Sequence, residues 1–198
     1  MNQLEKLFRA YESGNTFTAF DTETTGLQPQ SCNVIEIGAV KFNKNGIIDT
    51  YGTLINPNTP IPYQITKITH ITDEMVSNSP RFSAIAPEFN AFIAETTLIA
   101  HNAEFDVSFM NAEFERNNMK KLHSPAVPAI DTVPLARKAF PQCENHKLQY
   151  LATYFNIESG NAHRATDDAR VCMEVFLQCI ESFRKANPQI TVAQPSLF

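Results

Sequence analysis

The sequence predicts an α/β protein with a mixed, five-stranded β-sheet flanked by helices. The order of its elements is the main reason, because three strand-like segments come first and helix-like and strand-like segments then alternate. A turn signal, Asn-Lys-Asn-Gly at 43–46, joins the second and third strands and predicts an antiparallel β-meander. The chain has 198 residues, of which 43% are hydrophobic, which is enough for one domain with a sizeable core.

The first part of the chain is expected to form one helix and three strands. Apolar residues recur three or four positions apart over 2–12, which predicts an amphipathic helix, and Ser-Gly-Asn at 13–15 ends it. Strands are predicted at 16–22, 34–42 and 47–55, and the second of them is rich in β-branched residues.

Shorter elements are predicted in the rest of the chain, after a segment in which three prolines exclude regular structure. Pro87 is compatible with a helix only in its first turn. Further strands are expected at 97–100 and 129–131. Helices are expected at 63–69, 72–78, 83–94, 104–118, 132–139, 146–155 and 165–186.

The chain is expected to have three parts. A helical extension at 1–15 precedes the main domain at 16–186. The segment 187–198 lacks charge and helical periodicity after its proline, so we expect a flexible tail.

Composition excludes several classes of protein. No apolar run approaches the roughly 20 residues of a membrane span, and the N-terminus lacks the basic and apolar regions of a secretory signal. The four cysteines form no Cys-x-x-Cys pair, which argues against a zinc ribbon or a thioredoxin-type site. Cys172 and Cys179 are expected to share a packed helix face. We therefore expect a cytoplasmic protein without a membrane partner.

The formal net charge of −5 argues weakly against nucleic acid as a partner, because nucleic-acid-binding proteins usually present a basic surface. This argument fails if several carboxylates bind metal, since two divalent cations would cancel four of the negative charges. The presence of such ligands therefore matters more than the total charge.

The first candidate cluster lies on the first strand. Asp21 and Glu23 are two residues apart, so both carboxylates are expected on the same face of the strand. Two like charges beside apolar strands are costly unless a cation compensates them, and oxygen ligands suit Mg²⁺ or Mn²⁺. The alternative is a strand end whose acidic side chains face solvent.

Two further clusters follow. Asp106 is expected in the first turn of a helix after a buried strand, where α/β sheets place active sites, although an acid there also suits the helix dipole. His163 lies in a predicted loop, five residues before Asp168 in the last helix. A histidine can act as a general base near neutral pH, or simply as a cap or a surface partner.

Taken together, the clusters resemble the DEDDh family of 3′→5′ exonucleases. FDTETTG at 20–26, HNAEFD at 101–106 and HRATDDA at 163–169 are similar to the family's three motifs, and the resemblance covers roughly residues 16–180. It is closest to the proofreading exonucleases of bacterial DNA polymerase III, both the epsilon subunit and the exonuclease domain of PolC-type polymerases. VIEIGAV, ITKITHITDEMV and DTVPLARKAFP add support. The resemblance implies a ribonuclease H-like fold.

The resemblance also implies a role for each motif residue. Related DEDDy enzymes have Tyr four residues before the last Asp, where this chain has Arg164, whereas His163 stands five before Asp168 and favours it over Asp167. His163 would be the general base for the attacking water, and the products would be nucleoside 5′-monophosphates from the 3′ end. Two divalent cations, Mg²⁺ or Mn²⁺, would be bound by Asp21, Glu23, Asp106 and Asp168.

Substrate contacts are also implied by the resemblance. The backbone after the first motif would hold the terminal nucleotide, and His163 and Asn102 would add contacts. Gln64 and Thr69 align with substrate-contacting positions at which relatives often have Glu and His. His70, His123 and His146 are expected to be surface or packing residues, and Asp131 to brace a helix N-terminus. The nucleotide-holding residues would be Thr24, Thr25, Gly26 and Leu27.

The last five residues, Gln-Pro-Ser-Leu-Phe, resemble the pentapeptide that binds the bacterial sliding clamp, with Pro as a departure at its second position. Gln194 would donate or accept hydrogen bonds, and Leu197 and Phe198 would be apolar anchors. The expected partners are thus DNA with single-stranded 3′ ends, a sliding clamp and the catalytic subunit of DNA polymerase III.

Two alternatives stay open at this point. A ribonuclease of the same superfamily would use the same chemistry to trim RNA 3′ ends. A non-catalytic clamp adapter would be expected to have lost at least one of the five key residues, and this chain has all of them.

Overall fold

The computed structural model describes residues 3–122, 129–160 and 162–190. Within these ranges, no helix is both long enough and apolar enough to cross a membrane. Some of the sequence-based predictions lie outside the described residues: the histidine at 123 and the three clamp-binding residues Gln194, Leu197 and Phe198.

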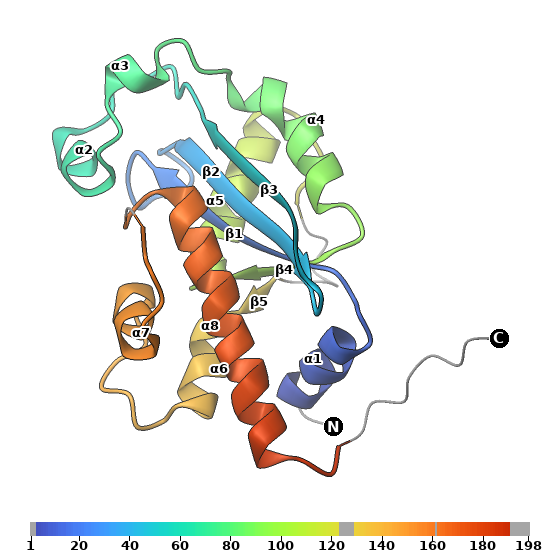
Figure 1. Ribbon diagram of the computed structural model, residues 1–198. Helices are drawn as coiled ribbons and strands as arrows, with labels where there is room; N and C mark the ends of the chain where they lie inside the picture. Colours follow the sequence, from blue (N-terminus) through green and yellow to red (C-terminus); the bar gives the residue numbers. More distant parts are fainter. Residues whose placement is uncertain (1–2, 123–128, 161, 191–198) are drawn as a thin grey trace.

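The predicted α/β class and mixed five-stranded sheet are confirmed (Figure 1). The order across the sheet is β3-β2-β1-β4-β5. The first three strands pair antiparallel, and the last two extend the sheet parallel to β1. The strands are β1 (Phe17–Thr24), β2 (Val34–Asn43), β3 (Gly46–Leu54), β4 (Thr97–Ala100) and β5 (Ile130–Asp131).

Helices cover both faces of the sheet. One face is covered by α1 (Gln3–Glu12), α6 (Thr132–Ala139), α7 (Leu148–Phe155) and α8 (Ala165–Ala186). The other face is covered by α4 (Phe82–Ile93) and α5 (Ala103–Arg116). The short helices α2 (Tyr63–Thr69) and α3 (Asp73–Val76) belong to a small separate cluster at one end of the sheet (Figure 1).

Side chains along β1 point alternately to the two faces of the sheet and belong to two core clusters, one on each face. Phe17 stacks on Phe42 with ring centroids 5.8 Å apart and contacts Phe176 of α8 at 5.3 Å. Phe20 points to the opposite face and contacts Phe89 of α4 at 6.4 Å. The amphipathic helix α1 buries its apolar stripe on α8, where the ring of Phe8 lies 5.2 Å from a phenylalanine ring.

The start of α8 rests directly on the sheet. Gly38 of β2 and Gly52 of β3 are opposite each other in register. A Cβ atom at Gly38 would lie 2.1 Å from the carbonyl carbon of Ala165, and one at Gly52 would lie 2.7 Å from the hydroxyl of Thr166. Because neither residue has a side chain, the first turn of α8 approaches the strands closely. This contact fixes the position of Asp168 in the same turn.

The expectation for Pro87 is wrong. Pro87 is the sixth residue of α4 and lies beyond its first turn. A proline at this position removes one helical hydrogen bond. The helix nevertheless continues because Phe82, Ile85 and Phe89 of the same helix are buried in the core, so tertiary packing outweighs the local preference.

Candidate active site

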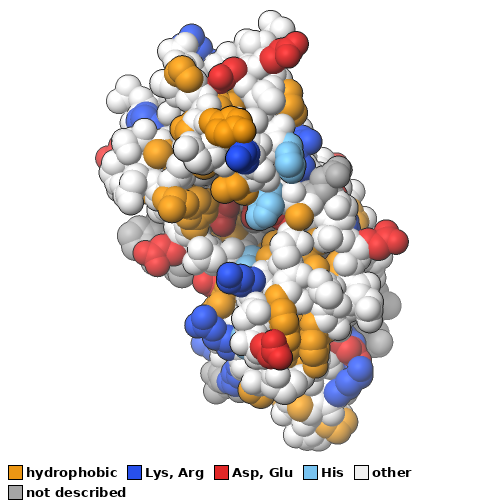
Figure 2. Space-filling view, turned by 90° about the vertical axis from the view of Figure 1, so that its left-hand side faces the viewer, with side chains coloured by type: hydrophobic (Ala, Val, Ile, Leu, Met, Phe, Trp, Pro, Cys, Tyr) orange, Lys and Arg blue, Asp and Glu red, His pale blue; other side chains and the backbone are white. Residues whose placement is uncertain are grey.

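Four acidic side chains from three separate segments meet at one cavity. Asp21 and Glu23 come from the end of β1, Asp106 from the first turn of α5, and Asp168 from the first turn of α8. All four, together with His163, line a cavity of about 640 Å³. Figure 2 faces this side of the molecule and shows acidic and histidine side chains in a hollow with hydrophobic side chains around it.

Asp106 ties α5 to β1. Its Oδ1 atom accepts hydrogen bonds from the backbone N–H of Thr22 at 2.9 Å and from the Thr22 hydroxyl at 2.8 Å. Thr22 lies between Asp21 and Glu23, so its side chain points to the other face of the strand. One residue therefore fixes the third acid relative to the first two, and sequence analysis missed this role of Thr22.

Asp168 is fixed from two directions. The backbone N–H of His163 donates to its Oδ2 at 3.0 Å, and Nε2 of Gln149 in α7 donates to its Oδ1 at 2.7 Å. Ligand atoms of Glu23, His163 and Asp168 all lie within 4.8 Å of one another. Among the described residues that line the cavity, Asp167 is absent, so the geometry favours Asp168 as the third-motif acid.

An ion pair between half-buried Arg164 and buried Glu36 holds the loop that contains His163. Arg164 donates to the Glu36 carboxylate through Nε at 3.1 Å and through Nη2 at 2.7 Å. Glu36 also accepts the backbone N–H of Ala165 at 2.9 Å, at the start of α8. Only 4% of Glu36 is exposed. Sequence analysis missed Glu36, although an acidic residue within the apolar strand at 34–42 was a usable signal.

Burial makes the cavity unfavourable for negative charge. It raises the pKa of Glu23 to about 8, with a further increase from the charge of Asp168. Burial also raises the pKa of Asp106 to about 7, despite the hydrogen bonds from Thr22. The pKa of Asp21 is raised well above its ordinary value by burial and by the neighbouring acids. This arrangement fits divalent cations, which would compensate several carboxylates at once.

We expect the metal-free protein to lose thermal stability between pH 5 and pH 8. The ordinary pKa values of Asp106 and Glu23 are 3.8 and 4.5, whereas the folded-state values are about 7 and about 8. The folded state therefore binds more protons in this range, and the stability present below pH 4 is lost as pH rises through 7 to 8. Calorimetry in the presence of a chelator should show a fall in Tm of about 5 °C or more.

Two controls accompany this measurement. Saturating Mn²⁺ should reverse most of the loss at pH 8, because a cation stabilises the ionised carboxylates. Glu23→Gln should flatten the pH dependence because it removes one of the titrating groups. An identical pH dependence in wild type and Glu23→Gln would contradict the assignment.

The structure brings some of the predicted substrate contacts to the cavity. Leu27 and Asn102 line it, and 76% of Leu27 is exposed. Thr24 and Thr25 are buried, and the Thr24 hydroxyl donates to the carbonyl of Gly26 at 2.6 Å. Among the described residues, Thr24, Thr25 and Gly26 do not line the cavity.

The two predicted substrate contacts on α2 also lie away from the cavity. Within the described chain, neither Gln64 nor Thr69 lines the cavity. Gln64 is exposed on α2. Thr69 is buried, and its hydroxyl donates to the carbonyl of Ile65 and accepts from the N–H of Ile71, both at 3.1 Å. The Thr69 side chain therefore already has hydrogen-bond partners inside its own helix and turn.

His101 also lines the cavity and was not singled out from the sequence. Its ring nitrogens contact the Thr132 hydroxyl and the His146 carbonyl, each at 2.8 Å. Burial lowers the pKa of His101, which favours a neutral ring that joins these segments. The prediction for Asp131 is confirmed, because its carboxylate caps α6 by accepting the N–H of Val133 at 2.8 Å.

Comparison with known proteins agrees with this geometry. The family model described as "Exonuclease" matches residues 18–176. The chain is 49% identical over 173 residues to DNA polymerase III subunit epsilon of Treponema pallidum, a match that covers 86% of this chain and 79% of that protein. The chain belongs to the exonuclease family. The predicted class of enzyme, a 3′→5′ exonuclease, is confirmed by this membership.

Two more comparisons place the exonuclease among its relatives. It is 38% identical over 176 residues to a PolC-type DNA polymerase III of Clostridium perfringens, which covers 89% of the exonuclease but 12% of that polymerase. The nuclease domain of 3′hExo, a DEDDh family member bound to rAMP, has a TM-score of 0.70 and 17% identity over 91% of the exonuclease and 97% of that chain. The predicted fold is thereby confirmed.

Proposed function

We propose that this exonuclease hydrolyses DNA from its 3′ end, releases nucleoside 5′-monophosphates, and serves proofreading or repair beside a replicative polymerase. The observation that carries the proposal is the meeting of four carboxylates and His163 at one open cavity. The 49% identity to a polymerase III epsilon subunit supports DNA as the substrate. An exonuclease that acts beside that polymerase would be located in the cytoplasm.

The residues of the cavity fit two divalent cations, Mg²⁺ or Mn²⁺, with Asp21, Glu23, Asp106 and Asp168 as ligands. When bound, such cations supply Lewis-acid stabilisation of the phosphoryl oxygens and lower the pKa of water. His163 is exposed and its ring lies within 4.8 Å of ligand atoms of Glu23 and Asp168. From this position the imidazole accepts the proton of the attacking water and passes it to solvent.

The segment after β1 would hold the terminal nucleotide. Leu27 is exposed at the rim of the cavity and offers an apolar surface for a base. Gly26 precedes Leu27 and lets this segment pack closely on Cys32. Asn102 faces the same cavity from the start of α5 and would add a polar contact. Together these residues would orient the last phosphodiester toward the carboxylates.

Two protein partners complete the proposal. The identity to the epsilon subunit supports a DNA polymerase III catalytic subunit as one partner. The tail sequence supports a sliding clamp as the other, with Gln194, Leu197 and Phe198 as the contact residues. Either contact would bring the exonuclease to the 3′ end of a growing strand.

A gel assay tests the activity and the sugar preference together. The protein is incubated with 5′-labelled single-stranded DNA or with the matching RNA, in Mg²⁺, in Mn²⁺ or in a chelator. We expect a metal-dependent ladder that shortens from the 3′ end on DNA, and none with Asp168→Ala. A ladder on RNA alone would assign the enzyme to RNA processing. The lack of a ladder on both substrates would contradict the proposed function.

A further inference from the structure

We propose that Glu113 and Arg116, at the C-terminal end of α5, position the nucleotide-holding loop for catalysis. This inference rests on the proposed function, in which the segment after β1 holds the terminal nucleotide. Neither residue lines the candidate active-site cavity among the described residues. Both would act through the loop at 25–33, and neither would touch the substrate.

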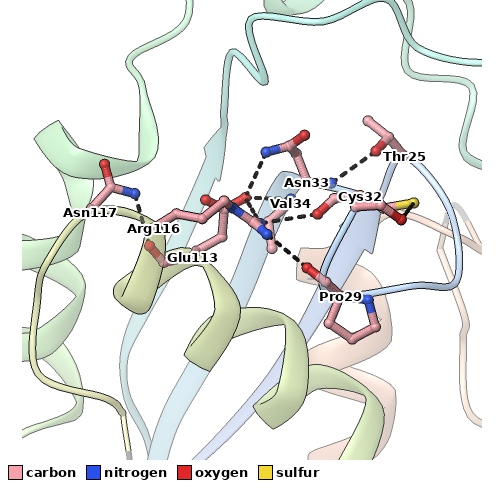
Figure 3. A network of polar contacts seen from close by, with 9 residues as sticks. Thr25, Pro29, Cys32, Asn33, Val34, Glu113, Arg116 and Asn117 are labelled. Carbon is pink, nitrogen blue, oxygen red and sulfur yellow. Dashed lines mark hydrogen bonds and ion pairs between the residues drawn. The ribbon is translucent and has the colours of Figure 1, made fainter.

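Arg116 holds the far side of this loop through its backbone. Its Nη1 group donates to the carbonyl of Pro29 at 2.7 Å, and its Nη2 group donates to the carbonyl of Cys32 at 3.0 Å (Figure 3). The planar guanidinium can satisfy both carbonyls at once, which a lysine ammonium cannot do with the same geometry. The loop is therefore clamped at two points by one side chain.

Glu113 holds the end of the loop and orients Arg116. Its carboxylate accepts the backbone N–H of Val34 at 3.0 Å and the Asn33 side-chain amide at 3.3 Å, and it pairs with Arg116 at 2.9 Å (Figure 3). Only 4% of Glu113 is exposed. A buried carboxylate requires such partners, so the network is complete only when the loop is in place.

Residues 29–33, which Glu113 and Arg116 hold, contact the nucleotide-holding residues at 25–27. The N–H of Thr25 donates to the carbonyl of Asn33 at 2.8 Å, and the N–H of Asn33 donates to the Thr25 hydroxyl at 2.9 Å. A Cβ atom at Gly26 would lie 2.7 Å from the Sγ atom of Cys32. The anchored limb at 29–33 thus packs directly against the limb that would hold the nucleotide.

Helix α5 therefore positions both the carboxylates and the nucleotide-holding loop of the proposed site. Its first turn contributes Asp106, which binds Thr22 of β1, and its last turns contribute the Glu113–Arg116 pair. The carboxylates and the loop are consequently fixed to the same body. If the anchor is lost, the loop samples other conformations, and the apparent affinity for the terminal nucleotide falls in proportion to the populated fraction of the competent one.

The test compares Arg116→Gln, Arg116→Lys and Glu115→Gln in the full chain with metal present. Arg116→Gln removes the clamp, and Arg116→Lys keeps the charge without the two-point geometry. Glu115→Gln is the matched control, because Glu115 lies on the same helix and is exposed like Arg116, but pairs with Lys121 instead of the loop. We measure kcat and KM on single-stranded DNA and the inhibition constant of thymidine 5′-monophosphate.

We expect Arg116→Gln to raise KM and the inhibition constant about tenfold while kcat changes less than about threefold. Arg116→Lys should be intermediate, and Glu115→Gln should behave like wild type. Unchanged values in Arg116→Gln, or a loss confined to kcat, would overturn the inference while the wild-type activity still supports the proposed function. A wild-type chain that degrades neither DNA nor RNA would instead overturn the proposed function, and this inference with it.

Discussion

Replacing Asp21 by Asn is expected to abolish exonuclease activity and at the same time to stabilise the metal-free protein. Burial raises the pKa of Asp21, and the charges of Asp106, Glu23 and Asp168 raise it further. Removal of this charge weakens cation binding, and the loss of Lewis-acid stabilisation should lower kcat at least about 10³-fold. The same substitution relieves repulsion in the empty cluster, and about 1 kcal/mol of relief raises Tm by about 3 °C.

The variant should lose activity and yet melt at a higher temperature. This combination is expected of a carboxylate that binds metal, and not of one with a structural role. Activity is measured on single-stranded DNA at saturating Mn²⁺, and Tm is measured by calorimetry in a chelator at pH 8. Asp49→Asn is the matched control, because Asp49 is exposed on β3, away from the cavity. A variant that retains a tenth of the activity, or that melts below wild type, would show that Asp21 has a mainly structural role.

The acidic part of the site was predictable from sequence because local geometry determines it. Two acids at alternate positions of a strand must share a face, and an acid in the first turn of a helix after a buried strand must lie near the strand end. The structure places Asp21, Glu23 and Asp106 accordingly. The choice of Asp168 over Asp167 followed from the family motif, in which His stands five residues before the acid. In the structure the backbone N–H of His163 donates to the Asp168 carboxylate.

The supporting contacts were not predictable because they join segments that are far apart in the chain. Glu36 and Arg164 are 128 positions apart and meet only because the first turn of α8 rests on β2. Arg116 binds backbone carbonyls of the loop at 25–33, and every residue has a carbonyl, so the sequence contains no sign of the pairing. Pro87 shows the same limit, since packing overrides a local rule.

The predicted substrate contacts also differ in how far they lie from the motifs in the chain. Leu27 and Asn102 follow motif residues directly, and the structure brings both to the cavity. Gln64 and Thr69 were chosen by alignment across a loop and a short helix, where a shift of one residue changes the direction of a side chain by about 100°. Thr69 is accordingly turned into its own helix, with its hydroxyl bonded to Ile65.

Replacing His163 by Asn is expected to lower kcat by about 10² to 10³ with little change in KM or in cation binding. The imidazole is the proposed proton acceptor, and loss of a general base typically has an effect of this size. His163 has a left-handed backbone with φ of 63°, which Asn tolerates better than most residues. The hydrogen bond to Asp168 comes from the backbone N–H, so Asn should keep it and leave the carboxylate in place.

His70→Asn is a closely matched control for this substitution. His70 is also exposed, and it has a left-handed backbone with φ of 60° at the end of α2. Because His70 does not line the cavity within the described residues, its substitution should change kcat less than about twofold. Added imidazole should partly restore the activity of His163→Asn, since the position is open to solvent. A greater loss in His70→Asn than in His163→Asn would assign the proton acceptor to α2 instead.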